Sequence, residues 1–485
     1  MTRKRKPFPL LENVTIASMA AEGKAIARVD EQVVFVPYAA PGDVCDIQVV
    51  RKKRSYIEGR ISNLTVASPM RVAPRCSHFG FCGGCCWQHI PYEKQLEAKQ
   101  QQVVDAFTRI GKVYPRDYLP IVGADDPYRY RNKLEFTFSH KRWLLPDDLQ
   151  NYPEGTPIEP ALGFHVPRLF DKVLDVEKCH LGSEISDRIR LFVRNYCMDR
   201  LEDYPFFDLK NQDGMMRSLL IRTASTGEIM VVLMFYHDDP PKRMALLAAI
   251  DKAFPEITSL CYVINPKCND TLTGLNVEVY SGRNYIVEEM EGLRFGVGAK
   301  SFYQTNSKQA YKLYSVVREF AGLLGKELVY DLYTGTGSIA SFISRYCRRV
   351  VGIEYVEDAV ADARINCRIN RIDNAEFFAG DMKDILTEEF VRDHGRPDVL
   401  ITDPPRAGMH EDVVRTILKT EPKRIVYVSC NPATQARDLS LLLSDGRYEL
   451  LKSRAVDMFP QTHHIENVAL LELKSSQGDS LGTVL

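Results

Sequence analysis

Long hydrophobic runs and an excess of charge of either sign are both missing from this sequence of 485 residues. No apolar run approaches the roughly 18 residues that cross a bilayer, so we expect no membrane-spanning segment and no membrane partner. The basic N-terminus lacks the following apolar stretch of about 7–15 residues that marks a secretory signal, which predicts a reducing, cytoplasmic location. The 63 Lys and Arg residues balance 64 Asp and Glu residues, and the resulting net charge of −1 taken alone argues against a nucleic-acid partner.

What is present is typical of a folded, multidomain α/β protein. Hydrophobic residues make up 45% and charged residues 26% of the chain, and its length predicts about three domains. We expect a small barrel resembling the oligonucleotide-binding (OB) fold over residues 1–66, because five short strand-like segments are separated there by turn residues. These segments are Val14–Ser18, Ala25–Val29, Val33–Val36, Val44–Val50 and Tyr56–Ile61.

Charge is also unevenly distributed along the chain. Residues 1–60 contain eleven Lys and Arg but seven Asp and Glu, a local net charge of 11 − 7 = +4. Phosphate binding depends on where cations cluster and not on their sum. A basic barrel of this type therefore predicts RNA contact, although a merely solvated basic tail would show the same charges.

The rest of the chain divides by its pattern of secondary structure. Residues 67–300 predict a central α+β domain, with a cysteine-containing loop, a helix near 91–110 and a strand-rich region after about residue 120. Over residues 301–485 strands and helices alternate, which predicts a doubly wound, Rossmann-like α/β domain. Its expected strands are Leu328–Leu332, Val350–Glu354, Glu376–Phe378, Val399–Thr402 and Arg424–Ser429.

A glycine turn follows the first of these strands. Gly335 and Gly337 fit the fingerprint of a dinucleotide-binding turn. Asp331 favours S-adenosylmethionine (SAM) instead, because a carboxylate at this strand end would repel a pyrophosphate but neutralise the cationic end of SAM. Glu354 ends the next strand, 354 − 337 = 17 residues after Gly337, and could accept both ribose hydroxyls of either cofactor.

Three further groups follow later strands. Asp403-Pro404-Pro405-Arg406 ends one strand, with Arg406 where amino-methyltransferases have an aromatic residue and with no cysteine in the loop. These two features argue against methylation of an exocyclic nitrogen and of cytosine carbon 5. Cys430 follows the next strand and precedes Asn431-Pro432, and Glu466 ends a polar loop. Taken singly, Cys430 could be a buried thiol and Glu466 a surface carboxylate.

Together these groups suit methylation of carbon 5 of uracil, a carbon that is a poor nucleophile by itself. A thiolate that adds to carbon 6 makes carbon 5 nucleophilic, and a base must later remove the carbon 5 proton. Cys430 and Glu466 are available for these two roles, and Arg406 or Gln304 for stabilising the developing oxyanion. We expect Arg406 or a helix N-terminus to lower the pKa of Cys430.

In these motifs and their order, the sequence resembles the bacterial RNA uracil-5-methyltransferases, above all the 23S rRNA branch with an N-terminal TRAM barrel. The resemblance also includes Ser301–Asn306 and the cysteines of the central domain. It implies that Cys430 is the nucleophile and Glu466 the base. It further implies that SAM contacts Gln304, Tyr333, Ser338, Glu354, Asp381 and Asp403.

The cysteines form one clustered set. Cys76, Cys82 and Cys85 lie on one loop, and Cys179 is the best distant candidate for a fourth ligand, whereas Cys86 is expected to point away from the set. Four thiolates suit zinc as well as iron–sulfur chemistry, and the spacing does not separate the two. The resemblance implies a 4Fe–4S cluster.

We therefore expect an enzyme that methylates a uridine of 23S rRNA and acts as a monomer. A methyltransferase for the uracil of the tRNA T-loop is the first alternative. The second is an RNA-binding iron–sulfur protein without catalytic activity.

Overall fold

The structure, a computed structural model, describes residues 8–474 and forms two compact units. The first unit contains the chain up to Ala98, Ala124–Lys308 and Phe459–His464. The second contains Lys99–Gly123, Gln309–Met458 and the chain from Ile465 onward. The expected domain boundaries after residues 66 and 300 stay predictions. Within residues 8–474, no helix is long and apolar enough to cross a membrane.

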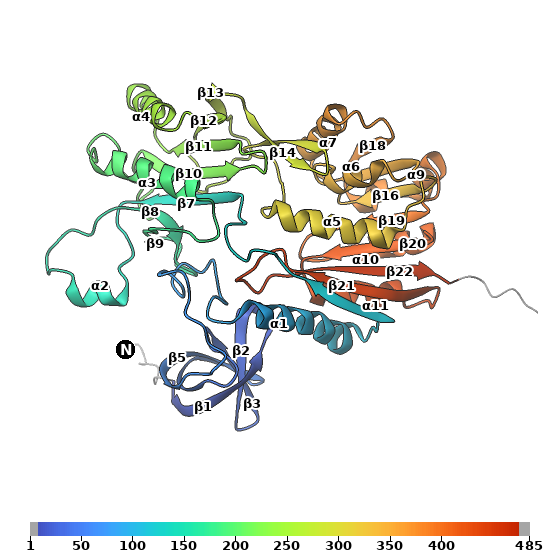
Figure 1. The fold of residues 1–485 in the computed structure, drawn as a ribbon, viewed down its shortest axis with the longest axis horizontal. Coiled ribbons are helices and arrows are strands. Elements are labelled where there is room, and N and C mark those ends of the chain that lie inside the picture. The colour runs from blue at the N-terminus through green and yellow to red at the C-terminus, as the bar shows by residue number, and fades with distance from the viewer. Residues whose placement is uncertain (1–7, 475–485) are drawn as a thin grey trace, which may run out of the picture. The chain divides into compact units, whose positions relative to one another are not determined.

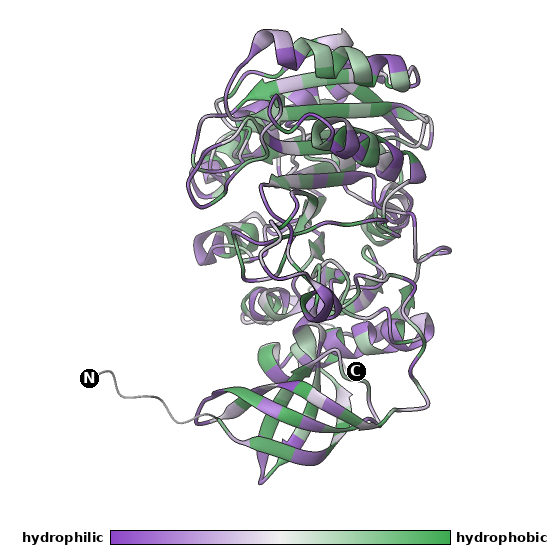
Figure 2. Ribbon diagram, turned by 90° about the vertical axis from the view of Figure 1, so that its left-hand side faces the viewer, coloured by the Kyte–Doolittle hydropathy of each residue, from purple (hydrophilic) through white to green (hydrophobic). Residues whose placement is uncertain are grey.

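The first unit begins with the expected five-stranded closed barrel. Its strands are ordered β1-β2-β3-β5-β4. Side chains alternate between a buried and an outward-facing position along β2 and β4, and Figure 2 shows the matching alternation of hydropathy. The strands are β1 (Leu10–Met19), β2 (Lys24–Val29), β3 (Gln32–Pro37), β4 (Val44–Lys52) and β5 (Tyr56–Val66), with a short helical turn η1 (Ala21–Gly23).

A seven-stranded sheet forms the rest of the first unit's framework, in the order β13-β12-β11-β10-β7-β8-β9. Its strands β10 and β11 form an antiparallel hairpin around Ser225-Thr226-Gly227. The strands are β7 (Lys133–Ser139), β8 (Ala161–His165), β9 (Val173–Leu174), β10 (Met216–Thr223), β11 (Ile229–Phe235), β12 (Ser259–Ile264) and β13 (Glu278–Gly282). The unit also has helices α2 (Pro146–Asn151), α3 (Glu184–Met198) and α4 (Pro240–Ala253), and the hairpin of β14 (Tyr285–Met290) and β15 (Leu293–Gly298).

The second unit is built on an eight-stranded sheet, in the order β18-β17-β16-β19-β20-β22-β21-β6 (Figure 1). The first five strands of this order run parallel, and β22 runs antiparallel to β20. The strands are β6 (Asp117–Val122), β16 (Leu328–Leu332), β17 (Arg349–Glu354), β18 (Ala375–Ala379), β19 (Val399–Thr402), β20 (Arg424–Ser429), β21 (Tyr448–Val456) and β22 (Glu466–Leu473). The expected doubly wound sheet is confirmed, with β6 as an edge strand that the alternation after residue 301 did not predict.

Helices connect these strands as the alternating pattern predicted. Two helices come before strand β16 in the chain. They are α1 (Tyr92–Asp105), which continues into the π-helical turn η2 (Ala106–Gly111), and α5 (Ser307–Ala321). The remaining helices are α6 (Ser338–Ser344), α7 (Glu357–Ile369), α8 (Met382–Ile385), α9 (Glu388–His394), α10 (Glu411–Thr420) and α11 (Pro432–Leu442). The strand order changes direction between β16 and β19, so the carboxyl ends of these two strands are where such sheets usually bind ligands.

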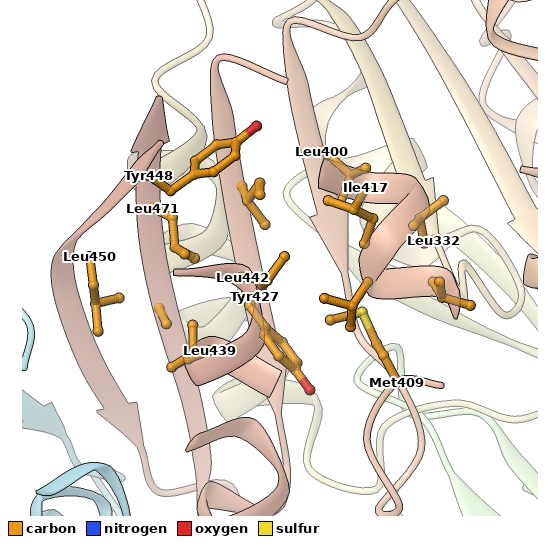
Figure 3. Packing of buried hydrophobic residues seen from close by; sticks show 14 of the residues in the cluster. Leu332, Leu400, Met409, Ile417, Tyr427, Leu439, Leu442, Tyr448, Leu450 and Leu471 are labelled. Carbon is orange, nitrogen blue, oxygen red and sulfur yellow. The ribbon is translucent and has the colours of Figure 1, made fainter. Parts of the chain in front are cut away.

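The main core of the second unit lies between this sheet and the helices that cover it. Figure 3 shows Leu439 and Leu442 of α11 and Ile417 of α10 packed with Tyr427 and Leu471 of the sheet. All five side chains are buried, and each leucine or isoleucine contributes about 1.5–3 kcal/mol relative to an exposed position. This packing holds the strand ends in a rigid arrangement.

A buried ion pair adds to this core. Lys99 Nζ lies 2.5 Å from Asp457 Oδ1, and both side chains are fully buried within the second unit. Asp457 also donates its backbone N–H to Val122 O at the end of β6. The pair therefore connects α1 to the chain that follows β21, close to the loop that leads to Glu466.

We predict that Lys99→Met lowers the free energy of unfolding by about 3–5 kcal/mol, because the variant leaves the Asp457 carboxylate buried without its cation. Urea unfolding followed by circular dichroism measures the change. The double variant Lys99→Met/Asp457→Leu should recover most of the loss, since it removes both charges. Equal stability of Lys99→Met and the wild type would contradict a structural role for the pair.

Candidate active site at the strand ends of the second unit

The turn between β16 and α6 has the conformation that its glycines require. Gly335 and Gly337 have φ values of 56° and 72°, in the left-handed region that favours glycine. A Cβ on Gly337 would lie 2.9 Å from Ala363 Cβ, so only glycine fits there. A Cβ on Gly335 would meet no atom within 4 Å, which leaves open space over this part of the turn.

Glu354, at the end of β17, holds this turn. Its Oε2 accepts a hydrogen bond from Gly335 N at 3.0 Å, and its Oε1 accepts one from Val356 N at 2.9 Å. A carboxylate oxygen can accept a second hydrogen bond. Glu354 is therefore committed to the backbone of the turn and still has acceptor capacity for the hydroxyls of a ligand.

Asp331 lies beneath the same turn and is almost completely buried. Thr334 Oγ1 donates a 2.5 Å hydrogen bond to its Oδ2, while Oδ1 accepts no hydrogen bond from residues 8–474. Burial raises the pKa of Asp331 to about 7, although hydrogen bonds from the Thr334 hydroxyl and the backbone N–H of Ala340 oppose the shift. A buried acceptor without a partner costs free energy, so this site favours a cationic or hydrogen-bond-donating ligand.

Two more carboxyl groups lie at strand ends of the same sheet, Asp403 directly after β19 and Glu466 at the start of β22, with β20 between these two strands. Burial and then the charge of Asp331 raise the pKa of Asp403 to about 7. Burial and then the charge of Asp403 raise the pKa of Glu466 well above its ordinary value, and Arg406 opposes this. These carboxyl groups cannot all be ionised together without a compensating positive charge.

Cys430 follows β20 and is half-buried. Burial raises the pKa of its thiol to about 11, followed in size by the charges of Glu466 and Asp403. Arg406 forms a hydrogen bond with the thiol and lowers its pKa, but by less than the other effects raise it. Arg406 therefore lowers the pKa of Cys430 as expected, but the net pKa still lies above its ordinary value, because desolvation outweighs the single cation.

The loop with Arg406 is held by the chain that follows Cys430. Asn431 Nδ2 and Thr434 Oγ1 donate to Arg406 O at 3.0 and 3.1 Å. Asn431 also caps helix α11, its side chain accepting a hydrogen bond from Ala433 N at 3.1 Å. The same turn therefore places the thiol and its neighbouring cation.

The four cysteines of the predicted ligand set lie together in the first unit. Each thiol has a pKa raised mainly by burial, and the charges of other members of the set contribute to the shifts of Cys76, Cys82 and Cys85. Backbone N–H groups donate to three of the sulfurs: His78 to Cys76, Gly84 and Cys85 to Cys82, and Leu181 and Gly182 to Cys179. The thiol of Cys86 lies 3.7 Å from His463 Nδ1.

This arrangement suits a thiolate-bound group in its chemistry. Burial and backbone N–H donors surround the sulfurs of protein-bound iron–sulfur clusters in the same way. Over residues 8–474, however, no three His, Cys, Asp or Glu side chains approach closely enough to form a metal site as they stand.

Comparison with known proteins assigns the chain to a family. Residues 278–474 match the family described as tRNA (Uracil-5-)-methyltransferase, and residues 12–62 match the TRAM domain. An uncharacterized RNA methyltransferase of Porphyromonas gingivalis is 62% identical over 458 residues, which cover 94% of this chain and 98% of the relative. The chain belongs to the RNA uracil-5-methyltransferase family.

Other relatives agree with this assignment. An uncharacterized RNA methyltransferase of Chlorobaculum tepidum is 39% identical over 466 residues, covering 95% of each chain. The crystal structure of Pyrococcus abyssi tRNA (uracil-54, C5)-methyltransferase in complex with S-adenosyl-L-homocysteine has a TM-score of 0.71 and 26% identity, covering 94% of this chain and 99% of that one. SAM is accordingly the methyl donor of this methyltransferase, and the partnerless Oδ1 of Asp331 and the open space at Gly335 fit such a cationic cofactor.

The methyltransferase brings most of its predicted site residues to one region of the second unit. Ser338 begins α6 beside Tyr314, with a 3.0 Å hydrogen bond between their hydroxyls, and Tyr333 adopts a positive φ of 61° within the glycine turn. Asp381 caps α8 by accepting a hydrogen bond from Lys383 N at 3.2 Å. Gln304 belongs to the first unit, where its carbonyl accepts a hydrogen bond from Asn132.

Tyr314 of α5 is a site residue that sequence reasoning missed. It is buried, and its hydroxyl is close enough to Asp403, Asp331 and Glu466 for their charges to raise its pKa, after burial. The only signal in the sequence is that Tyr314 lies on the apolar face of a helix, which predicts burial but no role in a site.

We predict that alkylation of Cys430 by iodoacetamide accelerates throughout the range from about pH 7 to pH 10, because the thiolate is the reactive form and the raised pKa keeps it scarce. Mass spectrometry of the Cys430 peptide measures the rate. Arg406→Gln should slow the reaction, since it removes a charge that lowers the pKa. Asp403→Asn should speed it above pH 7. A plateau below about pH 9 would contradict the raised pKa.

Proposed function

We propose that this methyltransferase methylates carbon 5 of a uridine in 23S rRNA through a covalent intermediate on Cys430. The observation that carries the proposal is the grouping of Cys430, Arg406 and Glu466, which interact electrostatically at the ends of β19, β20 and β22. A nucleophile, a cation and a buried carboxyl group are the three parts that this chemistry requires.

In the first step, the Cys430 thiolate donates an electron pair to carbon 6 of uracil. The carbon 5–carbon 6 double bond opens toward oxygen 4, and the resulting enolate makes carbon 5 nucleophilic. Arg406 stabilises the thiolate before the attack, because its guanidinium donates a hydrogen bond to the sulfur. The positive charge of a bound cofactor further favours ionisation of this thiol, whose pKa the neighbouring carboxylates raise.

SAM supplies the methyl group, which carbon 5 takes with loss of neutral S-adenosylhomocysteine. Glu466 then removes the remaining carbon 5 proton. The electrons of that C–H bond restore the carbon 5–carbon 6 double bond, and the C–S bond breaks to return the Cys430 thiolate. The raised pKa of Glu466 makes its ionised form a stronger base for this step.

The remaining site residues are proposed to hold the cofactor. Asp331 would take the cationic amino-acid end, Glu354 the ribose hydroxyls, and Gly335 and Gly337 the close approach of the turn. Tyr333, Ser338, Asp381 and Asp403 are proposed cofactor contacts by resemblance to the family, as is Gln304. The geometry of the turn and the partnerless Asp331 Oδ1 support this set.

RNA is the substrate class of the family, and the barrel offers a surface that suits it. Arg51, Lys52, Lys53 and Arg54 are exposed where β4 turns into β5. The Lys53 ammonium lies 5.3 Å from the centre of the Tyr56 ring. Among residues 8–474, no acidic side chain forms an ion pair with these four cations. Phosphates are the expected counter-charges.

Two kinds of RNA are candidates for the substrate. The 23S rRNA proposal rests on resemblance, through the TRAM barrel combined with the cysteine set. The tRNA T-loop alternative is favoured by the Pyrococcus abyssi structure, a tRNA methyltransferase whose fold extends over nearly the whole of this chain. We also propose that the chain acts as a monomer, because one chain supplies all of the groups named above.

We further propose that Cys76, Cys82, Cys85 and Cys179 hold a 4Fe–4S cluster, with zinc as the alternative. The backbone N–H donors and burial described above support a thiolate-bound group. All twelve cysteines are free thiols, which suits the proposed reducing, cytoplasmic location.

We predict that Cys430→Ala keeps SAM binding but loses both methyl transfer and any denaturant-resistant RNA adduct, because it removes the nucleophile. Glu466→Gln should lower turnover by about 10²–10⁴-fold and retain methylated RNA as an adduct, since elimination needs the base. Gel electrophoresis of RNA labelled from tritiated SAM measures both. Cys347→Ala, a buried thiol of the same unit, serves as the matched control. Full activity of Cys430→Ala would refute the mechanism.

The RNA substrate is decided by tritiated-methyl transfer onto unmodified 23S rRNA and unmodified tRNA. We expect label in 23S rRNA, at a uridine that mapping of the labelled nucleotide identifies. Label in tRNA alone would replace this proposal with the T-loop alternative.

For the cysteine set, we predict that anaerobically purified protein is brown and contains iron and sulfide, and that Cys82→Ser loses both. Cys86→Ser should retain them, because Cys86 is the adjacent thiol outside the proposed set. Metal analysis and visible absorption measure the outcome. Stoichiometric zinc without iron would contradict the iron–sulfur assignment.

A further inference from the structure

A buried glutamine joins the two chain segments that carry the proposed nucleophile and base. Gln435 lies in the first turn of α11, five residues after Cys430, and is fully buried. Its Nε2 donates to Tyr427 O at 2.9 Å and to Asn467 O at 3.2 Å. Its Oε1 accepts a hydrogen bond from Asn467 Nδ2 at 2.8 Å. The amide thus spans from α11 to both β20 and β22.

Asn467 completes this network on the other side. It directly follows Glu466 and is also fully buried. Its Oδ1 accepts a hydrogen bond from Ser453 Oγ of β21 at 3.0 Å. Each amide therefore has partners for both its oxygen and its nitrogen. A satisfied network of buried amides has one low-energy geometry, because any displacement leaves a polar group without its partner.

The strand register shows what this network holds in place. Ser429 pairs with Asn467 in the antiparallel β20–β22 ladder. Cys430 follows Ser429 and Glu466 precedes Asn467, so both leave the ladder at the same end and on opposite strands. The spacing between the thiol and the carboxyl group is therefore set by the residues that fix this last pair of the ladder.

We propose that Gln435 and Asn467 are positioning residues that set the carboxyl group of Glu466 relative to carbon 5 of the substrate bound to Cys430. The inference rests on the proposed function. Leucine at either position would fill the site with apolar atoms but would form none of the four hydrogen bonds that the two amides make together. A displacement of a catalytic group by about 1 Å costs on the order of 10²-fold in rate.

The consequence is specific to one step. Addition of Cys430 to carbon 6 and methyl transfer do not use Glu466, whereas removal of the carbon 5 proton does. Loss of the Gln435–Asn467 network should therefore slow elimination and leave the earlier steps near their normal rates. Methylated RNA should then remain attached to Cys430.

The experiment is a single-turnover measurement with tritiated SAM and the RNA that the wild type methylates. Gln435→Leu should lower the rate constant of adduct breakdown by about 10–100-fold, the effect usual for groups that orient a catalytic residue. The rate of adduct formation and the Kd for SAM should change by less than about threefold, which is well below that range. Breakdown is first order, so its rate constant does not depend on the fraction of the variant that folds.

Two further variants sharpen the test. Asn467→Leu and the double variant Gln435→Leu/Asn467→Leu should show the same defect as Gln435→Leu, and not the product of two defects, because the two amides act as one unit. Thr420→Val is the matched control, since Thr420 is buried in the same unit and donates its hydroxyl only to Thr416 O within α10. It should break down its adduct at the wild-type rate.

Unchanged breakdown in Gln435→Leu would overturn the inference. So would equal losses in adduct formation, SAM binding and breakdown, which would indicate a purely structural role. If neither the wild type nor Glu466→Gln forms an adduct that depends on Cys430, the proposed mechanism itself fails. If the wild type forms and releases its adduct and Gln435→Leu releases its adduct at the same rate, only the inference about Gln435 fails.

Discussion

Desolvation of carboxyl groups at the strand ends of one sheet is the constraint on which the candidate active site depends. Asp331 lies near the end of β16, Asp403 directly follows β19 and Glu466 begins β22, and burial raises the pKa of each. Water cannot compensate three negative charges there, so the site is stable either with bound protons or with a cationic ligand. A sulfonium cofactor meets that requirement, and its neutral product does not.

The same desolvation acts on the thiol. Burial and the charges of two carboxyl groups raise the pKa of the Cys430 thiol, which makes its thiolate form scarce at neutral pH. Arg406 is the only neighbouring cation that lowers it in the described part of the chain. A cationic ligand would lower this pKa, because it would offset the negative charges of the two carboxyl groups.

Much of this could be predicted from the sequence because local patterns determine it. The strand bounds Leu328–Leu332, Val399–Thr402 and Arg424–Ser429 agree with the structure, since short apolar segments between turn residues have few other conformations. Residues placed directly after those strands, such as Asp403 and Cys430, were predicted to meet because parallel strands end at one edge. The glycine turn was predictable for the same reason, as Gly335 and Gly337 adopt the positive φ values that glycine favours.

Other features depended on contacts between distant segments. Strand β6 pairs with β21 across more than three hundred residues of sequence, and Lys99 pairs with Asp457. Tyr314, Gln435 and Asn467 belong to no motif, because their roles come from which groups surround them after folding. The raised net pKa of Cys430 has this origin too, since its adjacent cation is visible in the sequence and its burial is not.

The sequence by itself therefore determined the types of domain, the order along the chain of the strands that end at the candidate site, and the kinds of chemical group available there. Only the tertiary structure decided how those groups interact, because burial and the distances between charges are properties of the packed chain. Periodicity and turn residues are local, so a sequence expresses them directly. The solvation of a carboxyl group or a thiol depends on every segment that packs around it.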